Sequence, residues 1–158
     1  MKLDATDRAL LALLQRDAGL SNKELARKVG LAPSSCLERV KKLQRAGVLL
    51  GVHAEVAPRA LGIRLQALIA VRLARHSERE VCAFRDRLLA RPEILSFYHL
   101  SGAVDFLLHV AVRDVEHLRT LGAEALTRHK LVAHVETSLI FDHRRSHVLP
   151  ALETGTAP

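Results

Sequence analysis

Apolar side chains in the first third of the chain recur at helical spacing. Over residues 4–15 they fall every three or four positions, which predicts an amphipathic helix. Ser21 and Glu24 have the spacing of a capping box that begins a second helix, and Gly30 suits the left-handed residue that ends it. Pro33 fits the first turn of a third helix, where a missing amide N–H costs nothing. Short helices joined by a tight glycine turn predict a helix-turn-helix motif.

The third predicted helix has one apolar and one polar side. At 100° per residue we expect four apolar side chains to face the core: Cys36, Leu37, Val40 and Leu43. The opposite side is a narrow polar stripe of Ser34, Glu38, Lys41 and Arg45, flanked by Ser35, Arg39 and Lys42. Short hydroxyls and forked donors suit base edges and long cations suit phosphates, so this side has the composition of a DNA-reading helix. A solvated helix face carries similar charge runs and is the alternative for this helix taken alone.

Two further patterns follow the third helix. After Gly47, apolar and polar residues alternate over 48–56 across Gly51, which predicts a short hairpin, the wing of a winged helix-turn-helix. Residues 57–64 hold both Pro and Gly without clear periodicity and are interpreted as a linker. The DNA-binding domain is therefore expected over residues 1–56.

Residues 65–150 show a different order of elements. Alternating patterns predict strands over 65–74, 94–100, 105–112 and 131–141. One helix follows a second capping box at Ser77 and Glu80, and another follows Asp114 as its N-cap. The resulting β-α-β-β-α-β order is the signature of a ferredoxin-like sandwich, with both helices on one face of a four-stranded antiparallel sheet. The chain is thus predicted to be an α+β protein of two domains, with a frayed tail over residues 151–158.

The sheet is predicted to be apolar on both faces. Leu107 and Ala111 lie on the side of the third strand that the helices do not cover, and Leu68 and Ala70 lie on that side of the first strand. With no further element expected to cover that face, a second copy should cover it and form a homodimer. A dimer would also present two recognition helices to DNA half-sites related by a two-fold axis.

The distribution of charge indicates a polyanion as partner. The chain of 158 residues carries a net charge of +7, and residues 1–62 hold 11 Lys and Arg against 6 Asp and Glu. Aromatic residues make up 3% of the chain, and none lies in residues 1–62. Single-stranded nucleic-acid binders usually stack bases on aromatic rings, so the composition favours double-stranded DNA.

Composition also narrows the compartment and the chemistry. The longest run without Asp, Glu, Lys or Arg is 11 residues, which is shorter than the ~18 of a membrane-spanning helix, and the start has no signal-peptide core. Two cysteines, Cys36 and Cys82, make neither a disulfide framework nor a four-ligand zinc site. The nine histidines show no metal-ligand spacing. We expect a cytoplasmic protein without membrane contact, metal or cofactor.

Taken together, these residues resemble the Lrp/AsnC (feast/famine) family of bacterial and archaeal transcriptional regulators from Leu3 to about Pro150. The resemblance rests on an ordered set of short matches: Leu3-Asp4, Asp7, Glu24-Leu25-Ala26, Val29-Gly30-Leu31, Pro33 to Cys36, Arg39-Val40, Leu43, Gly47-Val48 and Gly62. It implies a winged helix-turn-helix joined to a ferredoxin-like ligand-sensing domain, in dimers that assemble further, often to octamers. It also implies an amino acid or related small metabolite as effector, and a protein associated with the nucleoid.

In this family the effector site lies near the turn between the second and third strands, between dimers. The matching stretch 102–106 keeps the Gly and Asp of the family motif, but Val104 and Phe106 stand where the motif has tyrosines. The effector-binding residues implied by the resemblance are Ser101, Gly102, Ala103, Val104, Asp105, Phe106, Thr137 and Ser138. Asp105 could hold an ammonium group and amides near Gly102 a carboxylate, although a turn glycine and a strand-entry aspartate are common in any hairpin.

The sequence therefore predicts a sequence-specific double-stranded DNA-binding transcriptional regulator and not an enzyme. The expected DNA-binding residues are Ser21, Asn22, Pro33, Ser34, Ser35, Glu38, Arg39, Lys41, Lys42 and Arg45. Two alternatives stay open: an enzyme of the same fold that resembles sirohaem decarboxylases, and a metabolite-binding oligomer without DNA binding. Neither of these needs the basic stripe. His129 and Lys130 stand where the family has a Pro-Gly-like turn, and they predict a locally different loop.

Overall fold

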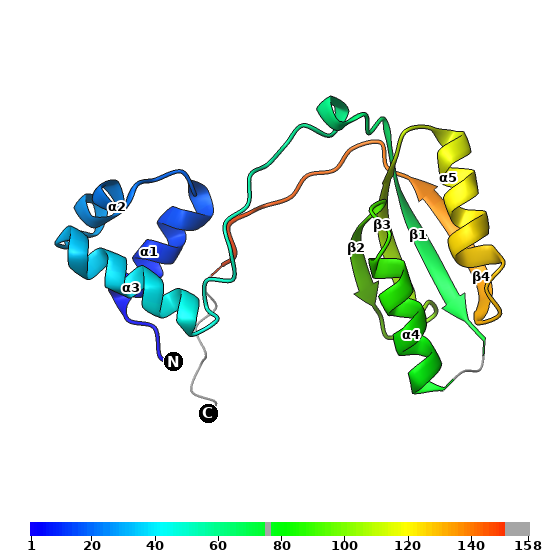
Figure 1. The fold of residues 1–158 in the computed structure, drawn as a ribbon, viewed down its shortest axis with the longest axis horizontal. Helices are drawn as coiled ribbons and strands as arrows, with labels where there is room; N and C mark the ends of the chain where they lie inside the picture. The colour runs from blue at the N-terminus through cyan, green and yellow to red at the C-terminus, as the bar shows by residue number, and fades with distance from the viewer. Residues whose placement is uncertain (75–76, 151–158) are drawn as a thin grey trace. The chain divides into compact units, whose positions relative to one another are not determined.

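The computed structural model describes residues 1–74 and 77–150, and the chain forms two compact units (Figure 1). The first unit comprises Met1–Glu55 together with the stretch that begins at Arg144, and the second comprises Val56–His143. Each unit has a cluster of buried apolar side chains of its own. In the ranges that the structure describes, no helix is long and apolar enough to cross a membrane.

Three short helices form the first unit, as predicted. They are α1 (Ala5–Arg16), α2 (Asn22–Val29) and α3 (Pro33–Arg45). At the start of α2 the Ser21 hydroxyl accepts a hydrogen bond from the Glu24 amide, and the Glu24 carboxylate accepts one from the Ser21 amide at 2.8 Å. Gly30 ends α2 at φ 68°, in the left-handed region that favours glycine. The capping box and the turn into α3 are therefore confirmed.

The hairpin predicted over residues 48–56 is wrong, because the structure has no strand there. The amides of Val48 and Leu49 both donate to the carbonyl of Leu43, so they close the end of α3 instead of pairing with another strand. Leu50 is 92% exposed, which shows that the alternating pattern has no apolar surface to pack against. A lone two-stranded hairpin is marginal in water, and alternation without a buried face does not stabilise one.

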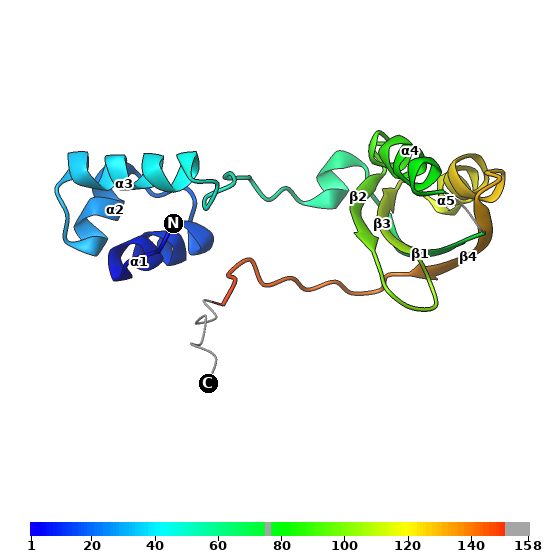
Figure 2. The ribbon, with the colours of Figure 1, turned by 90° about the horizontal axis from the view of Figure 1, so that it is seen from below.

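The second unit is the predicted ferredoxin-like sandwich. After a short 3-10 helix η1 (Pro58–Leu61), its elements are β1 (Leu65–Leu73), α4 (Glu78–Leu89), β2 (Ile94–His99), β3 (Phe106–Val112), α5 (Val115–Gly122), a π-helical turn η2 (Ala123–Thr127) and β4 (Val132–Leu139). The strands pair antiparallel in the order β2-β3-β1-β4. Figure 2 shows α4 and α5 side by side on one face of this sheet.

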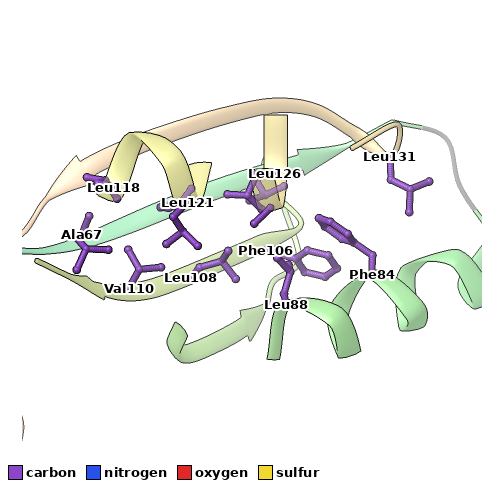
Figure 3. Close-up of a cluster of buried hydrophobic side chains, with 14 of the residues drawn as sticks. Ala67, Phe84, Leu88, Phe106, Leu108, Val110, Leu118, Leu121, Leu126 and Leu131 are labelled. Carbon is purple, nitrogen blue, oxygen red and sulfur yellow. The ribbon is translucent and has the colours of Figure 1, made fainter. Parts of the chain in front are cut away.

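The core of the second unit lies between the sheet and its two helices (Figure 3). The strand residues that the alternation predicted to point inward are buried: Ala67, Ile69, Val71 and Leu73 on β1, and Phe106, Leu108, Val110 and Val112 on β3. The helices contribute Phe84, Leu88, Leu118, Leu121 and, from η2, Leu126. The period-two pattern therefore identified the buried face of both central strands.

The opposite face of the sheet is mixed in character. The antiparallel register pairs Leu68 with His109 and Ala70 with Leu107, and these side chains alternate with the buried ones, so they lie on the face without helices. The three apolar members of this set are partly exposed, which agrees with the predicted apolar centre. Glu136 also pairs with Ala70 and is exposed, so the face is apolar in the middle and polar toward β4.

The limits of the two units differ from the ranges expected from the sequence. Residues 57–64, interpreted as a linker, lie inside the second unit and include η1. The first unit ends its first segment at Glu55, close to the expected residue 56. The predicted tail, residues 151–158, falls outside the described residues.

The stretch after Arg144 was expected in the second domain but groups with the first unit. The amide of Leu149 donates to Oε1 of Gln15 at the end of α1, at 2.7 Å. Nε2 of His147 lies 3.5 Å from Oε2 of Glu55. The chain therefore passes from one unit to the other twice, once in each direction.

Candidate functional site

The polar side of α3 is open to solvent. The residues of the predicted stripe and two of those that flank it are exposed: Ser34, Ser35, Glu38, Lys41, Lys42 and Arg45. The side chain of Lys41 is 50% exposed and that of Arg45 is 70% exposed. Eight of the ten expected DNA-binding residues thus lie on α3, with the hydroxyls near its start and most of the cations nearer its end.

Glu38 is the acid of this stripe. Its carboxylate oxygens lie 3.9 Å from Nζ of Lys41 and 3.8 Å from Nη2 of Arg45. Ion pairs this exposed contribute little and exchange readily for other partners. The arrangement leaves Glu38 able to accept a hydrogen bond from a base amine while its two neighbours contact phosphates.

Arg39 is held against the start of α1. Its Nη1 donates to Oδ2 of Asp4 at 2.7 Å and to Oδ1 of Asp7 at 2.9 Å. Asp7 is buried, and the two aspartates form the reciprocal capping box that begins α1. The Asp7 amide and then the Arg39 guanidinium hold the pKa of Asp4 below its usual value, and both carboxylates raise the pKa of Arg39.

This ion-pair network, formed by Asp4, Asp7 and Arg39, ties the middle of α3 to the start of α1. From the sequence, Arg39 is expected on a flank of the polar stripe, and Asp4 and Asp7 stand out only as part of the family resemblance. Arg39 therefore has a structural contact that a purely DNA-facing residue would lack, and Asp4 and Asp7 join the residues that orient the recognition helix.

The residues expected to contact DNA at the starts of α2 and α3 also form hydrogen bonds within the helix-turn-helix motif. Nδ2 of Asn22 donates to the carbonyl of Pro33 at 2.7 Å, which links the first turns of α2 and α3. The Ser21 hydroxyl donates to Oε2 of Glu24 at 2.7 Å within the capping box. These side chains fix the turn that sets α3 relative to α2.

Leu37 does not lie in the core, so this prediction is wrong. It is 41% exposed, whereas Cys36 and Leu43 on the same helix are fully buried as predicted. Val40 is half-buried. Burial raises the pKa of the Cys36 thiol, which keeps it protonated and fits a structural role.

The turn expected to bind an effector is anchored to β1. Gly102 has φ 134°, in the region that favours glycine, and Ser101, Gly102 and Ala103 are all exposed. Oδ2 of Asp105 accepts a hydrogen bond from the Leu73 amide at 2.7 Å, and the Asp105 amide donates to the Val71 carbonyl at 3.0 Å. Asp105 thus secures the hairpin to the neighbouring strand through both its side chain and its main chain.

One of the expected effector residues is placed differently from the expectation. Phe106 is 1% exposed and packs in the core against Phe97, with ring centroids 4.7 Å apart, so it does not line the turn. Val104 is half-buried. An aromatic ring at the first residue of a central strand packs inward when its face of the sheet is the one that the helices cover.

Thr137 and Ser138 lie on opposite faces of the sheet. Thr137 pairs with Ile69 on the helix face, and Ser138 pairs with Leu68 on the open face. Thr137 lines a groove of about 500 Å³ between α5 and β4, together with Val135, Arg119 and Arg128. The turn is tied to Leu73 of β1, whereas Thr137 pairs with Ile69, four residues before Leu73. Thr137 therefore lies roughly 13 Å from the turn along the strand. One chain therefore does not bring the expected effector residues together.

The loop before β4 is filled by His129. Its ring stacks on Phe84 with centroids 4.5 Å apart, and its Nδ1 accepts a hydrogen bond from the Leu131 amide. Burial, followed by the nearby Arg87, lowers the pKa of His129. Across the residues that have been placed, no cluster of three or more His, Cys, Asp or Glu side chains could hold a metal ion.

Each of the two units matches a known protein family. Residues 66–148 match the Lrp/AsnC ligand binding domain, and residues 3–49 match a winged helix-turn-helix DNA-binding domain. The HTH-type transcriptional regulator AldR of Mycolicibacterium smegmatis is 43% identical over 143 residues, which cover 90% of this chain and 84% of AldR.

Solved structures give the same result. The crystal structure of an AsnC family transcriptional regulator from Agrobacterium tumefaciens superposes with a TM-score of 0.87 at 28% identity, over 94% of this chain and 97% of that one. A transcriptional regulator from Neisseria meningitidis in complex with L-Met gives a TM-score of 0.85 at 32% identity, over the same shares. With its exposed recognition helix, its ferredoxin-like second unit and these matches, the chain belongs to the Lrp/AsnC family of DNA-binding transcriptional regulators.

Proposed function

We propose that this regulator reads specific double-stranded DNA sites with α3 and responds to an amino acid or related small metabolite bound by its second unit. The observation that carries the proposal is the exposed side of α3, where Lys41, Lys42 and Arg45 stand beside Ser34, Ser35 and Glu38. A helix with short polar groups at one end and long cations at the other suits the major groove of a duplex.

The side chains of α3 divide the work. Lys41, Lys42 and Arg45 contact phosphates and supply most of the affinity and its dependence on salt. Ser34, Ser35 and Glu38 contact base edges, where a good pairing contributes about 1–3 kcal/mol of discrimination. Arg39, held by Asp4 and Asp7, positions the helix instead of reading bases. The helix N-termini beside Ser21, Asn22 and Pro33 add backbone contacts to phosphate.

The effector site that we propose uses the turn around Gly102 of one chain and the β4 region of another. Within a single chain Thr137 and the turn lie apart, so a second copy is needed to complete such a site. Asp105 would face the ammonium group of an amino acid, and amides around Gly102 its carboxylate. The L-Met complex of the Neisseria relative supports an amino acid as ligand.

We also propose that the chain works as a homodimer through the open face of its sheet, and that dimers assemble further. The partly exposed Leu68, Ala70 and Leu107 at the centre of that face support this arrangement. A two-fold dimer presents two copies of α3 to a palindromic site. Because its target is chromosomal DNA, we place the protein in the cytoplasm at the nucleoid.

A selection of bound duplexes from a random pool, with and without a panel of amino acids, tests this function. We expect enrichment of one palindromic sequence, and a change in affinity or assembly with at least one amino acid. A triple Ser variant of Lys41, Lys42 and Arg45 should lose binding, while Arg79→Ser, which removes an exposed cation of α4, should bind as the parent does. Failure of the parent to enrich any duplex at low salt would refute the proposal.

A further inference from the structure

The recognition helix carries one large apolar side chain on the border of its polar stripe. Leu37 is 41% exposed, although Cys36 before it and Leu43 after it are fully buried. The apolar cluster of the first unit consists of other residues: Leu10, Leu25, Ala26 and Cys36, with Leu13, Leu14, Leu20, Val29 and Leu31 packed against them. The side chain of Leu37 is therefore available to an outside partner.

Helix geometry sets the direction of this side chain. At 100° per residue, Leu37 points about 40° from Lys41 and about 60° from Ser34, but about 100° from the buried Cys36. Residues three and four apart are neighbours on a helix surface, so Leu37 lies between Ser34 and Lys41 in the space next to the stripe. A duplex that contacts Ser34 and Lys41 also meets Leu37.

The chemistry of the major groove then limits what Leu37 can contact. Base edges there present hydrogen-bond donors and acceptors, to which a leucine offers nothing, and a single apolar group, the C5-methyl of thymine. We propose that Leu37 is a specificity-determining residue that selects a thymine in each half-site through contact with its C5-methyl group. This inference rests on the proposed function, since it requires that α3 enters the major groove.

If Leu37 has no role in DNA recognition, the expected result is different. Single exposed apolar residues are common on protein surfaces, and they have no preferred partner. In that case the loss of one thymine methyl would cost the same whether Leu37 is present or absent. The two readings are separated by the coupling between one side chain and one methyl group.

The experiment is a double-mutant cycle on the duplex obtained by selection. Each thymine is replaced in turn by deoxyuridine, which keeps every hydrogen-bonding group and removes only the methyl. We expect the parent to lose about fourfold in affinity at one thymine of each half-site, which corresponds to burial of one methyl-sized group at ~0.8 kcal/mol. Leu37→Ala should bind the thymine and deoxyuridine duplexes equally, and Leu37→Met should keep most of the preference.

The controls distinguish three results. Leu50→Ala removes an exposed leucine outside α3 and should keep the full sensitivity to deoxyuridine. If the parent binds its selected duplex but loses nothing at any thymine, or if Leu37→Ala keeps the loss, the inference is overturned and the proposed function stands. If the parent binds no duplex at all, the proposed function itself is overturned, and this inference with it.

Discussion

The two units of this regulator are stabilised in different ways. Among the residues that the structure describes, the second unit buries a cluster of 15 between its sheet and its helices, whereas the buried cluster of the first unit has four. The first unit adds polar contacts that cross between helices: the ion-pair network formed by Asp4, Asp7 and Arg39, and the bond from Asn22 to Pro33. A small unit that keeps one side of a helix open to solvent cannot gain stability by burying that side. Specific polar contacts take that place.

The first prediction concerns the larger core and has the largest expected effect. Phe84→Ala removes a ring that is 1% exposed and stacks on His129, and it should lower the free energy of unfolding of the second unit by about 3–5 kcal/mol. Amide hydrogen exchange of β1 and β3 measures the change. Leu89→Ala, half-exposed on the same helix, should change it by less than about 0.5 kcal/mol. A large loss of protection in α1–α3 as well would show that the units do not differ as described.

The second prediction addresses the ion-pair network. Asp7→Ala removes a buried carboxylate that accepts from the Asp4 amide in the capping box and from Arg39, so it should destabilise the first unit by about 1–3 kcal/mol. Exchange of the α1–α3 amides should accelerate while that of the sheet stays the same. Arg8→Ala, an exposed residue of α1, is the matched control and should have little effect. Equal stability of Asp7→Ala and the parent would show that the ion-pair network does not stabilise the first unit.

The third prediction separates two cations of α3 by their salt dependence. Lys42→Ala should reduce the slope of log affinity against log salt by about 0.9, the value for one lost phosphate contact. Arg39→Gln should leave that slope unchanged while it lowers the stability of the first unit, because the network holds this guanidinium against α1. Binding titrations at four salt concentrations measure both slopes, at a temperature well below the unfolding of either variant. A reduced slope for Arg39→Gln would assign Arg39 to the phosphates.

The smallest expected effect is the pH dependence of a helix start. The Ser77 amide and hydroxyl, followed by Lys130, lower the pKa of Glu80 from 4.5 to about 2. Because the folded-state pKa is the lower one, this contribution to stability is complete above pH 4.5 and is lost as the pH falls toward 2. Glu80→Gln should flatten the acid side of the stability curve of the second unit.

The sequence was sufficient to predict an element where the contacts that stabilise the element are the ones that the pattern reports. The alternation on β1 and β3 identified the buried faces because those strands are central and covered by helices. The capping boxes at Ser21 and Ser77 were found because they depend on residues three positions apart. The hairpin predicted over 48–56 is absent, because alternation predicts a strand only when one face has something to pack against.

Two residues of α3 show what a helix pattern alone leaves open. Arg39 points about 40° from the buried Leu43, so its angle alone places it near the core side, where a charge needs partners such as Asp4 and Asp7. Leu37 points away from the core although it is apolar. Leu37 lies about 60° from Val40 and about 60° from Ser34, so the angle alone does not decide whether it faces the core. The identity of the partners of Arg39 depends on the packing of α1 against α3, which no local pattern contains.

The residues expected to bind an effector could be predicted only as a set. The sequence located the turn at Gly102 and the strand that carries Thr137 and Ser138, but strand register decides the face on which each side chain lies. Register places Thr137 and Ser138 on opposite faces and turns Phe106 into the core. The completeness of such a site then depends on assembly, which a single chain does not encode in its local patterns.

The DNA-binding unit is built from two separate stretches of chain, and this affects how such proteins can be recombined. A chimera joined at one point near Glu55 would bring in α1–α3 without the native residues that follow Arg144. The acceptor on Gln15 would then face a foreign segment instead of the Leu149 amide. Exchanging the DNA specificity of two relatives while keeping their ligand response therefore calls for two junctions, with the second one just beyond His143.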